Sequence, residues 1–88
     1  MLRSAKIDSN QKEIVRQLRC IPHISVYSTA QLKKFCDIVV GYCGRNYLFE
    51  IKKDKKSKLT DGESKFQDGW KGQVNIVTSV DEILKIIQ

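Results

Sequence analysis

A nearly continuous apolar run, residues 36–41, does most to limit the folds open to this chain. Its sequence is Cys-Asp-Ile-Val-Val-Gly, and Asp37 is its one charged residue. Because the run lacks the alternation of a half-exposed strand, it is typical of a central strand covered on both faces. We therefore expect a β-sheet with helices packed against it and with this strand in its interior.

A second strand follows at once and should pair with the first as an antiparallel hairpin. Residues 42–45 form a short connection in which Gly44 is the residue expected at positive φ. The side chains of residues 46–52 then alternate between the two faces of a strand. One face carries Glu50 and Lys52, and the other carries residues that can join the core: Tyr47, Phe49 and Ile51.

This hairpin should bring three charged side chains to one end of the sheet. Asp37 lies four residues before Gly41, and Glu50 lies four residues after Asn46. A turn between Gly41 and Asn46 therefore places Asp37 beside Glu50 or close to it. Lys52 shares the face of Glu50, so two carboxylates and an ammonium group should converge.

The remaining segments predict three helices and two further strands. The first helix covers residues 11–19, is capped at Asp8 or Ser9 and is ended by Pro22, and a strand over Ile24–Ser28 follows it. The second helix begins with the capping box of Thr60 and Glu63 and ends at Gly72. A strand over residues 74–78 and a helix capped by Ser79 complete the chain. The order α-β-β-β-α-β-α predicts an α/β fold with a central mixed four-stranded sheet. No repeat or long linker divides the chain, so we expect one domain over residues 1–88.

The net charge indicates the kind of binding partner, and the cysteine content indicates the cellular compartment. Sixteen Lys and Arg against ten Asp and Glu give a net charge of +6, which favours a polyanion, most simply nucleic acid. An anionic membrane surface is the alternative, but no long apolar run or lipidation motif supports it. Residues 1–10 lack the apolar core of a secretory signal, and three cysteines without a C-x-x-C pair indicate a reducing cytosol.

The converging residues Asp37, Glu50 and Lys52 suit metal-dependent phosphodiester hydrolysis. Carboxylate oxygens are the ligands that Mg²⁺ prefers, and the metal polarises the phosphoryl group and lowers the pKa of a bound water. Lys52 would lie beside the attacking water or the developing negative charge. The alternative is an ordinary surface ion pair, since an E-x-K spacing is common in basic chains.

These segments together resemble the PD-(D/E)XK nuclease superfamily, and within it the minimal stand-alone VRR-NUC domain found in phages. The resemblance runs from about Ser9 to the end of the chain. It rests first on the two strand segments, residues 36–41 and 48–52. It rests also on the segment from Leu59 and Thr60 through Phe66 to residues 70–72, and on the closing segments, residues 72–77 and 79–82.

The resemblance implies a restriction-endonuclease-like core and a divalent-metal-dependent, structure-selective DNA endonuclease, with Holliday junction resolution as one such activity. It makes Asp37 and Glu50 ligands of Mg²⁺ or Mn²⁺, adds the Ile51 carbonyl as a ligand, and makes Lys52 the catalytic lysine. Glu13 matches the acidic residue that the family places on its first helix. Because stand-alone members work as two-fold dimers, we expect a homodimer in the cytoplasm of a bacterial or phage-infected cell, with no small-molecule cofactor and no membrane partner.

Two positions depart from the family pattern. Cys36 stands where the family usually has Pro, which should change backbone rigidity and leave the ligand chemistry unaltered. Glu63 stands where the family tends to have Gln. Its first interpretation is the capping-box partner of Thr60, and a role in the active site is the alternative. Glu13 has a similar second interpretation, as a first-turn carboxylate stabilised by the helix dipole.

Basic residues surround the predicted site and are the candidates for DNA contact. The segment after Lys52 is rich in lysine, with only Asp54 opposing it, so it is either a solvated loop or a phosphate-binding one. The predicted nucleic-acid-binding residues are Lys53, Lys55, Lys56, Lys58, Lys33, Lys34 and Arg45. We expect Phe66 and Trp70, four residues apart, to form core or dimer contacts.

Two other classes of protein stay open. One is a non-catalytic DNA-binding or assembly protein that keeps the nuclease fold. The other is a small zinc-stabilised module, although the spacing of its four possible ligands matches no standard zinc motif; they are Cys20, His23, Cys36 and Cys43. Buried free thiols are the simpler expectation for Cys20 and Cys36. His23 is expected in a loop or at a strand end, with a general-base role as its alternative.

Overall fold

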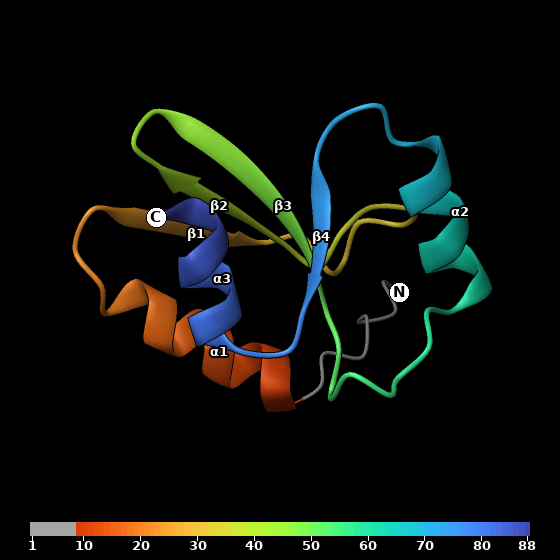
Figure 1. Ribbon diagram of the computed structural model, residues 1–88, viewed down its shortest axis with the longest axis horizontal. Coiled ribbons are helices and arrows are strands. Elements are labelled where there is room, and N and C mark those ends of the chain that lie inside the picture. Colours follow the sequence, from red (N-terminus) through yellow and green to blue (C-terminus); the bar gives the residue numbers. More distant parts are fainter. Residues whose placement is uncertain (1–8) are drawn as a thin grey trace, which may run out of the picture.

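A computed structural model describes residues 9–88 and shows a small α/β domain (Figure 1). Asp8 and nearly all of the N-terminal stretch interpreted as lacking a secretory signal lie outside these residues. The elements are α1 (Ser9–Arg19), β1 (Ile24–Ser28), β2 (Ile38–Tyr42), β3 (Arg45–Ile51), α2 (Asp61–Gly69), β4 (Val74–Val77) and α3 (Val80–Ile87). This order confirms the predicted α-β-β-β-α-β-α arrangement. None of the helices in the described part of the chain is long and apolar enough to cross a membrane.

The four strands form one mixed sheet in the order β1-β2-β3-β4. β1 and β3 are antiparallel to β2, whereas β3 and β4 are parallel. Cys43 and Gly44 connect β2 to β3, with φ angles of 52° and 77°. Two consecutive residues at positive φ are what a type I′ hairpin turn requires, so the turn needs Cys43 in this conformation as well as the predicted Gly44.

The core lies between one face of the sheet and the helices α1 and α3. α1 contributes Ile14 and Leu18, and α3 contributes Ile83. They pack with apolar side chains from the strands, of which Ile38, Val40 and Phe49 are fully buried. Figure 1 shows the two helices on the same side of the sheet.

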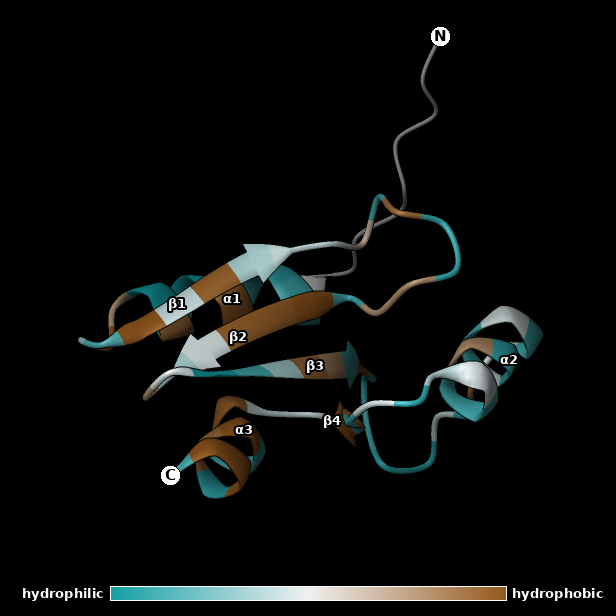
Figure 2. Cartoon of the chain, turned by 90° about the horizontal axis from the view of Figure 1, so that it is seen from above, coloured by the Kyte–Doolittle hydropathy of each residue, from teal (hydrophilic) through white to brown (hydrophobic). Residues whose placement is uncertain are grey.

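The opposite face of the sheet is covered less completely than the apolar run predicts. Val39 is only half-buried, and Ile76 on β4 is 43% exposed. α2 lies at the end of the sheet and not across this face (Figures 1 and 2). The expectation of a central strand buried on both sides is therefore wrong for the second side.

The capping box that begins α2 is present as predicted. The backbone N–H of Thr60 donates to Glu63 Oε1 at 2.8 Å, and the backbone N–H of Glu63 donates to Thr60 Oγ1 at 3.2 Å. The helix ends at Gly69, earlier than the predicted stop at Gly72, because the backbone of Trp70 is already extended. α3 has its predicted cap, since Ser79 Oγ accepts a hydrogen bond from the Glu82 backbone.

An aromatic cluster of Phe35, Phe66 and Trp70 joins α2 to the segment before β2. The three ring pairs have centroid separations of 5.4 to 5.6 Å. Edge-on and tilted ring contacts of this kind add to the free energy gained from apolar burial. The cluster therefore holds α2, and with it Glu63, next to the start of β2.

Candidate metal site

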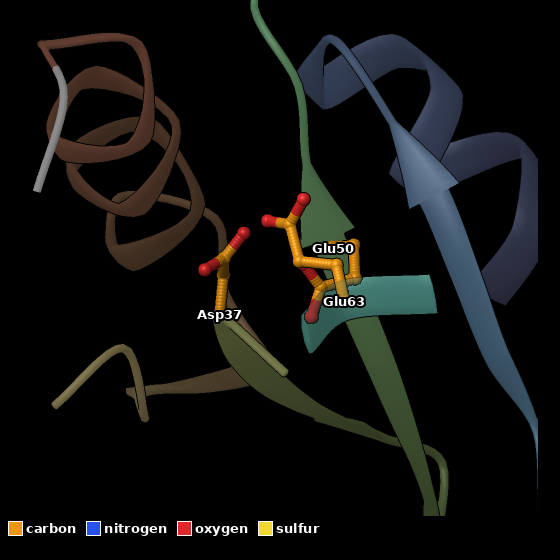
Figure 3. Close-up of side chains that lie close together, drawn as sticks. All are labelled: Asp37, Glu50 and Glu63. Atoms are coloured by element: carbon orange, nitrogen blue, oxygen red, sulfur yellow. The ribbon is translucent and has the colours of Figure 1, made fainter. Parts of the chain in front are cut away.

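Three carboxylates meet where β2 begins and β3 ends. Ligand oxygens of Asp37, Glu50 and Glu63 all lie within 4.8 Å of one another. Asp37 comes from the residue before β2, Glu50 from β3 and Glu63 from α2, and their side chains are directed toward a common space (Figure 3). Hard oxygen donors at this separation are what a divalent cation such as Mg²⁺ requires.

The register of the hairpin explains why Asp37 and Glu50 are neighbours. Gly41 pairs with Asn46 and Ile38 pairs with Phe49, so the next pair outward is Asp37 with Glu50. Asp37 lies one residue beyond the strand, but its backbone N–H still donates to the Phe49 carbonyl at 3.0 Å. The predicted convergence of Asp37 and Glu50 is therefore confirmed.

Two further hydrogen bonds fix Asp37 in place. Its Oδ2 accepts from the backbone N–H of Ile51 at 2.8 Å. Its carbonyl accepts from the backbone N–H of Thr29 at 2.8 Å. The Asp37 backbone is thus tied to the loop that follows β1, and its side chain to the end of β3.

Glu50 is the most unusual member of the cluster, because a carboxylate is buried without compensation. The residue is 1% exposed, and neither carboxylate oxygen has a hydrogen-bond partner among residues 9–88. Burial, followed by the charge of Asp37 and then by the hydrogen-bonding and charge interactions with the Glu63 side chain, raises the pKa of Glu50 to about 8. An uncompensated buried carboxylate is costly, and a bound cation would remove that cost.

Glu63 and Lys52 form an ion pair beside Glu50. The Lys52 ammonium group donates to Glu63 Oε1, the same oxygen that accepts from the Thr60 backbone. Burial acts to raise the pKa of Glu63, but the hydrogen bonds from Lys52 and Thr60 outweigh it and lower the pKa. Glu63 is therefore both the capping-box partner of Thr60 and a member of the carboxylate cluster.

A polar pocket of about 260 Å³ opens onto this cluster; it is lined by Gln11, Asp37, Ile51, Lys52, Lys53, Ser57 and Glu63. Gln11 and Ser57 are additions that the sequence interpretation missed. A signal for Gln11 was present, since it shares the helical stripe of Ile14 and Leu18 as a polar residue on an otherwise apolar face. In the structure Gln11 is 5% exposed.

The structure does not bring Glu13 to the cluster. Its carboxylate is exposed, pairs with Arg16 and accepts from Gln17 Nε2 at 2.7 Å. The hydrogen bond from Arg16 lowers the pKa of Glu13 to about 2. Because α1 begins at Ser9, Glu13 also lies beyond the first turn, so the helix-dipole interpretation is wrong too.

The predicted DNA-binding residues lie at different distances from the site. Lys53 lines the pocket, and Lys55 lies 3.9 Å from Glu82. Lys56, Lys58, Lys33 and Lys34 are exposed on loops. Arg45 is at the far end of β3, five residues from Glu50, which corresponds to about 17 Å along a strand.

The four possible zinc ligands do not converge. Among the described residues, the three carboxylates are the only group of three or more acidic, His or Cys side chains with ligand atoms this close together. Cys36 is buried as predicted, whereas Cys20, also predicted to be buried, is exposed; all three cysteines are free thiols. His23 is exposed in the turn before β1, at a φ of 70°.

Comparison of the chain with protein-family models, curated proteins and solved structures gives no match. The chemistry of the site itself therefore has to indicate the function.

Proposed function

We propose that the protein is a divalent-metal-dependent, structure-selective DNA endonuclease with a restriction-endonuclease-like core. The observation that carries this proposal is the buried, unpaired Glu50 carboxylate beside Asp37, Glu63 and Lys52. Burial of this carboxylate costs free energy unless a proton or a cation neutralises its charge, so the position favours binding of a cation. A cation-binding site in a chain of net charge +6 suits a polyanionic substrate.

Asp37 and Glu50 would hold Mg²⁺ or Mn²⁺, and Ile51, which lines the pocket, would add its carbonyl oxygen. The bound ion supplies Lewis-acid polarisation of the scissile phosphate and an activated water. The Ile51 N–H fixes the orientation of Asp37. Glu63 holds the Lys52 ammonium at the rim of the cluster, where it can stabilise the negative charge that develops on the phosphate.

A non-catalytic DNA-binding protein with the same fold is the alternative. It differs in one observable respect, which is cleavage. We would incubate the purified chain with a panel of duplex, nicked, flapped and four-way branched DNAs in Mg²⁺, in Mn²⁺ and in EDTA. Incision that needs the metal and favours one branched structure supports the proposal. Binding without incision under every condition would leave the non-catalytic alternative.

The lysine-rich loop offers a test of how the DNA is held. Replacing Lys53, Lys55 and Lys56 by Gln should weaken binding to all DNA sequences alike. The slope of log K against log salt should become shallower by up to about 3, because each phosphate contact contributes about 0.9. Filter binding between 50 and 300 mM NaCl measures this slope. An unchanged slope would show that these lysines are only solvated.

We also propose that the protein acts as a homodimer. A chain of 88 residues buries only about 60% of its unfolded surface, and several large apolar side chains stay exposed, among them Tyr27, Leu32, Trp70, Ile76 and Ile86. A two-fold dimer would present two metal sites to the two symmetric strands of a junction. Sedimentation equilibrium at micromolar concentration should give about twice the chain mass of 10.1 kDa. A species of single-chain mass would exclude the dimer and paired incision.

A further inference from the structure

A second hollow, distinct from the carboxylate pocket, lies along α1 beside the end of β1. It has a volume of about 440 Å³ and is lined by Gln11, Lys12, Val15, Arg16, Arg19, Cys20 and Ser28. We call it the α1 groove. Three cations and no carboxylate lie along it, so its rim is basic, although most of the surface that lines it is apolar.

The three cations form a regular row. Lys12, Arg16 and Arg19 follow one another at four and three residues, so they share one face of α1. At 1.5 Å per residue the row is about 10 Å long. Arg16 is partly neutralised by Glu13, but Lys12 and Arg19 form no ion pair with any residue in the described part of the chain.

The groove adjoins the carboxylate pocket at one shared residue. Gln11 lines both, and its Nε2 donates to Ser28 Oγ at 3.2 Å. Ser28 pairs with Ile38, the residue that follows Asp37. A strand whose phosphate lies at Asp37 and Glu50 can therefore pass over Gln11 and enter the groove.

We propose that the α1 groove holds the sugar-phosphate backbone next to the scissile phosphate, with Lys12 and Arg19 contacting phosphates. This inference rests on the proposed nuclease function and extends the DNA contact to a helix that the sequence interpretation did not assign to it. A row of about 10 Å spans about three nucleotides of one DNA strand, at about 3.4 Å each. A lipid surface fits less well, because α1 uses its apolar side chains in the core; Ile14, Val15 and Leu18 are all buried.

The test compares two double variants that remove the same charge. One is Lys12→Gln with Arg19→Gln, and the control is Lys71→Gln with Lys85→Gln, two exposed cations outside the groove. We would measure DNA affinity by filter binding in EDTA between 50 and 300 mM NaCl. The groove variant should lose about 2 units of salt slope and bind roughly 10- to 60-fold more weakly at 0.1 M salt. The control should keep the wild-type slope, and circular dichroism should show both variants folded.

The outcomes separate this inference from the function on which it rests. A wild-type chain that neither binds nor cuts DNA would overturn both. A wild-type chain that binds and cuts, with a groove variant of unchanged slope, would overturn the groove assignment alone. If the groove variant kept the wild-type salt slope for DNA but no longer bound anionic phospholipid vesicles that the wild type binds, the groove would be assigned to a membrane surface instead.

Discussion

Replacing Asp37 by Asn should abolish metal-dependent DNA cleavage and leave the fold intact. The variant loses the negative charge that binds the metal, but the Asn carbonyl oxygen can still accept the Ile51 N–H that Asp37 accepts at 2.8 Å. Lewis-acid catalysis is worth several kcal/mol, so we expect a loss of roughly 1,000-fold in the rate of incision. Single-turnover cleavage of the preferred DNA in Mg²⁺ measures this loss.

Lys52→Ala should be similarly inactive, because Lys52 is the ammonium group that Glu63 holds at the rim of the cluster. Lys85→Ala is the matched control, since Lys85 is exposed and does not line the pocket. All three variants should bind DNA and unfold cooperatively. Cleavage by Asp37→Asn at the wild-type rate would show that the site is assigned to the wrong residues.

Replacing Glu50 by Gln should stabilise the metal-free protein at alkaline pH. The pKa of Glu50 is about 8 in the folded chain and near 4.5 when unfolded. A raised pKa favours the folded state while the carboxyl group is protonated, so this contribution is complete below pH 4.5 and is lost as the pH rises through 8. Gln carries no charge, so the variant should gain roughly 2 to 4 kcal/mol over wild type at pH 9. Urea denaturation in EDTA at pH 5 and pH 9 measures the difference.

The same change should remove metal binding. Calorimetric titration with Mn²⁺ should show binding to wild type and none to Glu50→Gln. Glu13→Gln is the matched control, because Glu13 is an exposed carboxylate outside the cluster and should leave Mn²⁺ binding unchanged. A Glu50→Gln variant that was less stable than wild type at pH 9, or that bound Mn²⁺ normally, would contradict the account of this carboxylate.

The part of the site that lies on the hairpin could be predicted from the sequence. A two-residue turn fixes the register, and strand alternation fixes the faces, so counting outward from the turn places Asp37 opposite Glu50. The capping box at Thr60 likewise depends on residues only three positions apart. These features depend on local geometry, which the order of the residues determines directly.

The remainder of the site depends on contacts between distant segments. Glu63 reaches the cluster because Phe66 and Trp70 pack on Phe35, and no local pattern indicates this packing. The orientation of α1 likewise depends on contacts with distant segments that no local sequence pattern indicates. The helix begins at Ser9, and its packing on the sheet turns Gln11 toward the pocket and leaves Glu13 with Arg16.

The central claim is that Asp37 and Glu50 together hold a divalent cation. An anomalous difference map from a crystal grown with Mn²⁺ tests it most directly, because the signal locates the ion independently of any assay. We predict one strong peak between the carboxylates of Asp37 and Glu50, within reach of the Ile51 carbonyl, which is lost in crystals of Glu50→Gln. The absence of a peak there at a Mn²⁺ concentration that supports DNA cleavage would contradict the claim.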